Sequence, residues 1–265
     1  MRMLFIGTFL GMLIVIIANP INLSLSPMPD EIQYYQPLVK DWNENGISVI
    51  PSHNDTKPLS FLYLQKILRA DLTYKYTRLF NFILICAITL VIFKITNRKE
   101  SFLFIIIPTF LHSLWLTAEI IEVFFVLLSI YYIKDRGIFI GLAAVFRPYA
   151  VVYMMLINNK QRAYAILIGI LFSIILIYHG LFFPYANHLF NYSVTNHFYD
   201  ETDYGAIVFL ILFAILSSKN KTMLQYGLIA CIPLVVKLYG HYFLPAYTFF
   251  FIGYLLYYKG EVQSS

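Results

Sequence analysis

The sequence predicts an all-α protein, a polytopic transmembrane helical bundle of about eight to ten membrane helices, some of them short or broken. Three observations predict this fold class. The chain of 265 residues is 60% hydrophobic, only 12% of its residues are charged, and its mean hydropathy is +0.70. Apolar runs recur along the whole chain, and basic clusters lie between them. Because backbone groups in lipid must find hydrogen bonds within their own segment, these runs are expected to be helices.

Nine apolar runs are candidates for membrane helices, and most approach the roughly 17 to 25 residues that cross a bilayer. They cover residues 3–19, 79–95, 101–117, 119–133, 137–158, 163–183, 204–218, 223–237 and 239–258. The stretch "IIANPINLS" (16–24), where the first run ends, is a poor signal-peptide cleavage site, so residues 3–19 are expected to be a retained helix. Residues 1–265 are expected to form a single transmembrane domain.

The basic clusters predict the orientation of these helices. They are Arg2, Arg98 with Lys99, Lys134 with Arg136, Lys160 with Arg162, Lys219 with Lys221, and Lys259. By the positive-inside rule these clusters and the N-terminus are cytoplasmic, which sends residues 20–78, the turn 117–119 and the loops 184–205 and 237–243 outside. The net charge of +5 does not indicate nucleic acid, because the basic residues are spread between apolar runs instead of forming one patch.

The run 137–158 conflicts with this pattern, because both of its ends carry cytoplasmic signals. Its centre reads "FRPYA", in which Pro148 removes a helix hydrogen bond and Arg147 costs roughly 2.5 to 3.5 kcal/mol in hydrocarbon. We therefore expect two short helices, 137–147 and 149–158, with Arg147 near an outer cavity.

Residues 20–78 form the long first outer loop. Its "EIQYYQPLVKDW" places Ile32, Tyr35, Leu38, Val39 and Trp42 at amphipathic spacing, and "PLSFLYLQKIL" (58–68) is apolar but short. Both segments are expected to be interfacial helices that lie on the membrane.

Four acidic residues are candidates for chemistry on the outer side. Asp30 and Glu31 follow the first apolar run, where acids contribute little to topology, although a solvated loop pair is the ordinary explanation. Glu119 and Glu122 lie one helical turn apart at the outer end of a span. Helix-dipole stabilisation accounts well for Glu119 and less well for the deeper Glu122.

The candidate basic residues lie on the same predicted side. Snorkelling is the ordinary account of Lys57, Arg78 and Lys237, whereas Arg147 needs an anionic partner, either a phosphate or one of the glutamates. His241 beside Tyr242 is a candidate ligand contact. Cys86 and Cys231 fall inside apolar runs, and the histidines show no metal-binding spacing such as HExxH.

The order of the motifs is more specific than any one of them. It runs "PDEIQYY", "HNDTKPLSFLYLQKIL", "RLFNFILICAITLVIF", "LTAEIIEV", "FRPYA" and "GHYFLPAYTFF". This order resembles the GT-C superfamily of polyprenyl-phosphate-sugar-dependent glycosyltransferases, in particular the branch of protein O-mannosyltransferases and aminoarabinose transferases. The resemblance extends from about residue 3 to 258.

The resemblance implies an inverting transfer of a sugar, with mannose as first choice, from a polyprenyl- or dolichyl-phosphate donor to a lipid, glycan or protein hydroxyl. Asp30 would be the general base and Glu31 would orient the acceptor, the base or a divalent ion. Arg147, with Lys57, Arg78, Lys237 or His241, would bind the donor phosphate, and Tyr242 beside His241 would contact the substrate. Glu119 and Glu122 would bind hydroxyls or hold the basic residues. The need for a divalent metal stays open.

Two other classes remain. A lipid or solute transporter would use the same buried charges, and an inactive relative would be a subunit of a larger complex. In each case the chain is expected to be a multi-pass protein of the plasma membrane or endoplasmic reticulum, and the enzyme's active site would lie on the extracytoplasmic face.

Overall fold

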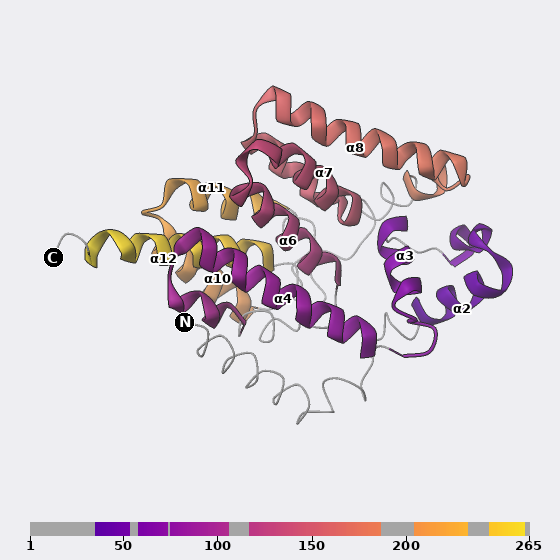
Figure 1. Ribbon diagram of the computed structural model, residues 1–265, viewed down its shortest axis with the longest axis horizontal. Helices are drawn as coiled ribbons and strands as arrows, with labels where there is room; N and C mark the ends of the chain where they lie inside the picture. Colours follow the sequence, from indigo (N-terminus) through magenta and orange to yellow (C-terminus); the bar gives the residue numbers. More distant parts are fainter. Residues whose placement is uncertain are drawn as a thin grey trace.

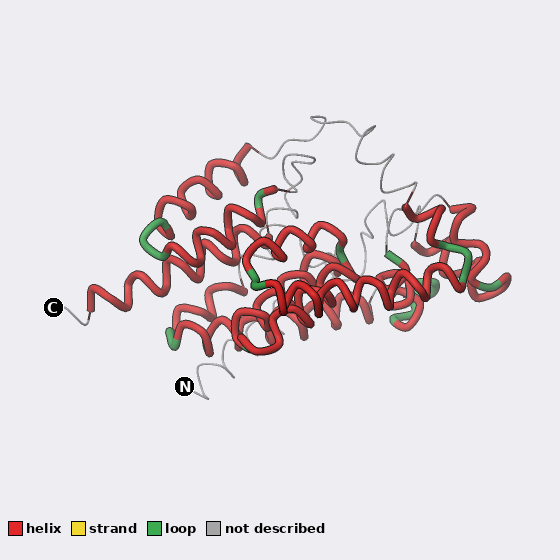
Figure 2. Tube along the Cα trace, turned by 90° about the horizontal axis from the view of Figure 1, so that it is seen from above, coloured by secondary structure: helices red, strands yellow, loops and turns green. Residues whose placement is uncertain are grey.

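The computed structural model describes residues 35–53, 58–73, 75–105, 117–186, 204–232 and 244–262. Within these ranges the chain is helical and contains no strand, which confirms the all-α class (Figures 1 and 2). The expected first helix, 3–19, lies outside the described residues.

The helices are mostly short. The α-helices are α2 (Gln36–Asn45), α3 (Leu59–Ile67), α4 (Lys75–Thr96), α6 (Thr117–Tyr131), α7 (Arg136–Phe146), α8 (Asn159–Tyr178), α10 (Tyr204–Ser217), α11 (Lys221–Ala230) and α12 (Leu244–Val262). The 3₁₀ segments are η3 (Ile47–His53), η4 (Lys99–Ile105), η5 (Ile133–Asp135) and η6 (Pro148–Leu156).

Two of the described helices, α4 and α8, are long and apolar enough to cross a membrane. The apolar part of α12, Leu244–Tyr257, is shorter, and α6, α10 and α11 have 15, 14 and 10 residues. These lengths fall below the roughly 20 residues of a straight span. Of the expected eight to ten membrane helices, some of them short or broken, two full-length candidates lie in the described part of the chain.

The main core joins both halves of the chain. Helix α6 packs against α4, α7 and α12, while α7 also packs against α8, and α12 also packs against α10 and α11 (Figure 1). Fully buried side chains at its centre include Ile88, Val126, Tyr153 and Phe249. Most of these contacts join helices that are neighbours in the sequence, and the contact between α6 and α12 connects the two halves of the chain.

Helices α2 and α3 form a second cluster at one end of the bundle, on the right of Figure 1. Leu38 and Trp42 of α2 pack with Leu62 of α3, together with Ala118 at the start of α6 and Leu176 near the end of α8. The hydroxyl of Thr77, in the first turn of α4, donates to Gln65 Oε1 of α3 at 3.5 Å. The starts of α4 and α6 and the end of α8 therefore meet at α2 and α3.

The basic turns lie at the opposite end. Helices α4 and α6 lead away from α2 and α3 to the basic pairs Arg98–Lys99 and Lys134–Arg136, and α8 starts beside Lys160 and Arg162. At 1.5 Å per residue, α8 separates the two ends by about 30 Å. The structure thus separates these basic turns from the predicted outer segments.

Segment 137–158 is broken as predicted. Arg147 is extended, with φ −144° and ψ 104°, between α7 and η6. The residue before a proline disfavours the helical conformation, so the break falls at Arg147. The second arm differs from the expected α-helix, because η6 is a 3₁₀ helix. The two segments contact each other, and Gln161, just after η6, bonds to Gly137 at the start of α7, so α7 and η6 form a hairpin that returns to its starting end.

Gln161 closes the open end of this hairpin. The backbone N–H of Gly137 donates to its Oε1 at 2.7 Å, and its Nε2 donates to the Lys134 carbonyl at 2.6 Å. Gly137 and Gly141 lie one turn apart on α7, where a Cβ atom would meet backbone atoms of Gln161 and Ala165 on α8. Small residues at this spacing let two helices approach closely.

Candidate functional site

Three predicted site residues meet inside the bundle. Arg147 Nη1 lies 2.7 Å from Glu122 Oε2, and Arg147 Nη2 lies 3.7 Å from Glu119 Oε1. All three residues are buried, with exposed fractions of 4%, 2% and 3% for Arg147, Glu122 and Glu119. We call Glu119, Glu122 and Arg147 the carboxylate–arginine cluster.

Local sequence explains how this cluster forms. Glu119 and Glu122 share one face of α6 because they are three residues apart in a helix that begins at Thr117. Pro148 disfavours the helical conformation at the preceding residue, Arg147, so α7 ends at Phe146 and Arg147 lies at the tip of the hairpin. The hydroxyl of Ser60 on α3 donates to the Val145 carbonyl at 2.6 Å, so the tip faces the α2–α3 end.

Electrostatics explains why these residues pair. A buried charge is costly, and its attraction to an opposite charge offsets this cost only when the geometry is good. The 2.7 Å contact to Glu122 is a charge-assisted hydrogen bond. Between the two partners expected for Arg147, a phosphate or a glutamate, the structure shows the glutamates.

Two tyrosines border the cluster. The Arg147 guanidinium lies 5.8 Å from the ring centroid of Tyr149, within the range of a cation–π contact. Tyr153 is fully buried beside Glu122, and its ring contacts Phe249 with centroids 5.8 Å apart. Sequence reasoning missed both tyrosines, although their position within six residues after Arg147 offered a weak local signal.

Arg78 lies at the same end of the bundle. It is 3% exposed, in the first turn of α4, next to the Thr77 that contacts α3. Ala118, which precedes Glu119, packs in the same α2–α3 cluster. A second buried arginine thus lies at the end where the α6 acids begin.

The other predicted site residues lie outside the described residues: Asp30, Glu31, Lys57, Lys237, His241 and Tyr242. Within the described ranges, no group of three or more His, Cys, Asp or Glu residues is placed to hold a metal ion.

No protein family, curated protein or solved structure that was compared with the chain matches it. The resemblance to the GT-C superfamily therefore rests on the order of the sequence motifs.

Proposed function

We propose that this chain is an integral-membrane inverting glycosyltransferase that moves a sugar from a polyprenyl- or dolichyl-phosphate donor to a hydroxyl acceptor. The observation that carries the proposal is the buried carboxylate–arginine cluster at the bundle end formed by α2, α3 and the start of α6. Buried ionisable residues in membrane helices are costly and mark functional sites. The motif order of the GT-C superfamily gives the reaction class.

The membrane placement rests on exposed apolar side chains. Along α8, five of these are between 51% and 55% exposed: Ile166, Leu167, Ile170, Leu171 and Ile174. Helix α10 likewise exposes Val208, Ile211, Leu212 and Ile215. A soluble monomer rarely exposes continuous apolar surface of this extent, so lipid is the solvent that fits these faces.

In the proposed reaction the acceptor hydroxyl attacks the anomeric carbon, the bond to the lipid phosphate breaks, and the centre inverts. Asp30 takes the hydroxyl proton, a role worth roughly 10²- to 10⁴-fold in rate, and Glu31 orients the acceptor. Asp30 and Glu31 precede Tyr35, which is buried in the α2–α3 cluster, by five and four residues in the sequence.

The pairing of Arg147 supports a division of roles among the cations. Its guanidinium is engaged by two carboxylates, so the glutamates hold the hairpin tip and orient Arg147. Arg78, with Lys57, Lys237 or His241, supplies positive charge to the phosphate as it leaves, beside the oriented Arg147. The sequence-based hypothesis named Arg147 together with these cations and left a glutamate as its alternative partner.

The experiment that tests the proposal incubates purified protein with a panel of polyprenyl-phosphate sugars and hydroxyl acceptors, with products analysed by mass spectrometry. One donor should be consumed, and Asp30→Asn should abolish its consumption without changing the thermal unfolding temperature. Full activity of a folded Asp30→Asn variant would remove Asp30 as the base. If the folded protein turns over no donor, the glycosyltransferase proposal fails.

A further inference from the structure

The segment that joins α3 to α4 exposes apolar side chains at the same end of the bundle. Ile67 is 72% exposed, Leu72 67% and Tyr76 53%. We call residues 66–73 together with Tyr76 the α3–α4 corner. Such a concentration of exposed apolar residues marks a surface that contacts another phase or partner.

The amphipathic faces of α2 and α3 do not provide this surface. Leu38 and Trp42 of α2 pack with Phe61 and Leu62 of α3, and all four are at most 4% exposed. Lys66 Nζ lies 4.4 Å from the centroid of the Trp42 ring and covers it. The faces that were expected to lie on the membrane therefore pack against each other, and the most exposed apolar side chain of α3, Ile67, lies in the corner.

This surface continues along a candidate membrane span. Tyr76, Leu79, Ile83 and Leu90 lie on one face of α4 by their helical spacing, and each is at least 40% exposed. The opposite face of α4, with Ile85, is buried in the main core. Tyrosines at the ends of membrane helices lie at headgroup level, so Tyr76 indicates that depth for the corner.

Arg69 occupies an unfavourable backbone position within the corner. Its φ is +55°, and its N–H donates to the Lys66 carbonyl while the N–H of Ala70 donates to the Gln65 carbonyl. This pattern is a Schellman motif, whose left-handed position is usually glycine. A side chain costs roughly 1 to 2 kcal/mol there, so the backbone at Arg69 favours glycine.

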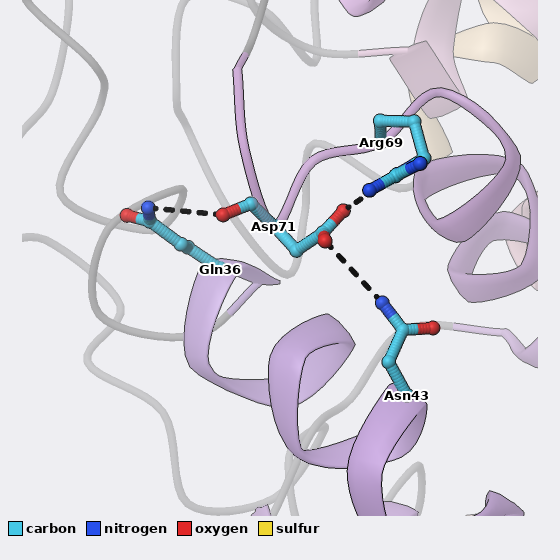
Figure 3. A network of polar contacts seen from close by, with 4 residues as sticks. All are labelled: Gln36, Asn43, Arg69 and Asp71. Carbon is cyan, nitrogen blue, oxygen red and sulfur yellow. Dashed lines mark hydrogen bonds and ion pairs between the residues drawn. The ribbon is translucent and has the colours of Figure 1, made fainter.

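Arg69 is the exposed cation of the corner, and its neighbour Asp71 holds the corner to α2 (Figure 3). The Asp71 side chain is 10% exposed, and its carboxylate accepts a hydrogen bond from Asn43 Nδ2 at 3.4 Å. The backbone carbonyl of Asp71 accepts from Gln36 Nε2. Asp71 thus ties the corner to α2. Arg69 contacts Asp71 at 3.4 Å, but its side chain is 56% exposed, which leaves the guanidinium accessible to a second anion.

We propose that the α3–α4 corner inserts Ile67 and Leu72 into the headgroup layer of the bilayer and that Arg69 binds the phosphate of an anionic lipid there. The inference rests on the membrane placement proposed above, and it is independent of glycosyl transfer. Its basis is the continuity of the exposed apolar surface with α4 and the exposed cation beside it.

Fluorescence quenching of single-cysteine variants tests the insertion. On a background with Cys86→Ala and Cys231→Ala, an environment-sensitive fluorophore is attached at Leu72→Cys in proteoliposomes. Leu171→Cys, on the exposed face of α8, and Lys219→Cys, in the basic turn before α11, are the lipid and water references. Shallow spin-labelled lipid should quench the probe at residue 72, deep spin-labelled lipid the probe at 171, and aqueous iodide the probe at 219.

The two proposals fail differently in this experiment. If iodide alone quenches residue 72 while lipid quenches residue 171, the corner lies in water and the inference is wrong. If iodide also quenches residue 171, the membrane placement of α8 fails, and with it the basis of both proposals.

Arg69→Gly removes the cation without destabilising the fold, because glycine adopts the left-handed backbone conformation without strain. Its effect on lipid binding is therefore separate from any effect on stability. Asn97→Gly is the matched control, since Asn97 has φ +53° in the turn after α4, at the basic end. Both variants should unfold at or above the temperature of the parent protein. With the probe at residue 72, spin-labelled phosphatidylglycerol should quench about fivefold better than phosphatidylcholine, since one basic residue contributes about 1 kcal/mol near an anionic surface.

Arg69→Gly should abolish this preference, whereas Arg69→Lys and Asn97→Gly should preserve it. An unchanged preference in Arg69→Gly would show that Arg69 does not bind the lipid phosphate.

Discussion

At the scale of single residues, Arg147 is a charged side chain held in the interior by two carboxylates. Its contacts to Glu119 and Glu122 join the tip of the α7–η6 hairpin to α6. The pairing has a structural consequence that is separate from catalysis. Removing one partner leaves a buried charge unpaired, whereas replacing all three residues by neutral ones removes every buried charge.

Arg147→Ala should therefore destabilise the folded protein by about 3 to 5 kcal/mol, because the glutamates lose their buried cation. Thermal or denaturant unfolding of the purified protein in detergent measures the loss in the free energy of unfolding. Arg98→Ala is the control, since Arg98 pairs at 3.7 Å with a half-exposed Glu100 and such a pair is worth at most about 1 kcal/mol. Equal losses in the two variants would contradict a special role of the buried cluster.

The triple variant Arg147→Met, Glu119→Gln and Glu122→Gln separates stability from activity. It should recover most of the stability lost in Arg147→Ala, because no buried formal charge remains at the cluster. Sugar transfer should stay low, since the residues proposed to shape the site are absent. A stable triple variant with full transfer activity would restrict the cluster to a structural role.

At the scale of elements, the hairpin depends on close contact between α7 and α8. A Cβ on Gly137 would collide with the Gln161 carbonyl oxygen, which belongs to the backbone and cannot rotate away. Gly169 on α8 has no atom within 4 Å of the equivalent position. Two helical glycines in the same pair of helices thus differ in their surroundings.

Gly137→Ala should lower the unfolding temperature, because α7 must move away from α8 and the Gln161 hydrogen bonds weaken. Gly169→Ala should leave stability unchanged or raise it by roughly 0.5 to 1 kcal/mol, since alanine favours a helix more than glycine does. Parallel thermal unfolding of the two variants measures the difference. A neutral Gly137→Ala would show that the α7–α8 contact is looser than described.

At the scale of the whole molecule, the basic turns and the α2–α3 cluster lie at opposite ends of α4, α6 and α8. The positive-inside rule then gives each end a side of the membrane. This orientation is proposed from the charge pattern, and only α4 and α8 among the described helices reach the length of a span.

A membrane-impermeant thiol reagent applied to intact cells checks the orientation. Asn43→Cys, on α2, should react from outside, whereas Lys134→Cys and Asn159→Cys should react only after the membrane is opened, because they lie at the basic end. All three positions are exposed in the fold. Labelling of residues 134 and 159 in intact cells would invert the proposed orientation.

Several features followed from the sequence alone. The helical class followed from long apolar runs, in which a helix pairs all backbone groups within the segment. The break at Arg147 followed from Pro148, and the pairing of Arg147 with an anion followed from the cost of an isolated buried charge. Each of these is a local property, set by one residue type or one run.

The tertiary structure decided which anion pairs with Arg147 and which apolar surface stays exposed. Glu119 and Glu122 became the partners of Arg147 only when α6 packed against the α7–η6 hairpin, 25 residues along the chain from Glu122. The apolar faces of α2 and α3 suited a membrane equally well until they packed on each other, which left Ile67 and Leu72 exposed. Amphipathic periodicity shows that a face must be buried, but the three-dimensional packing selects what buries it.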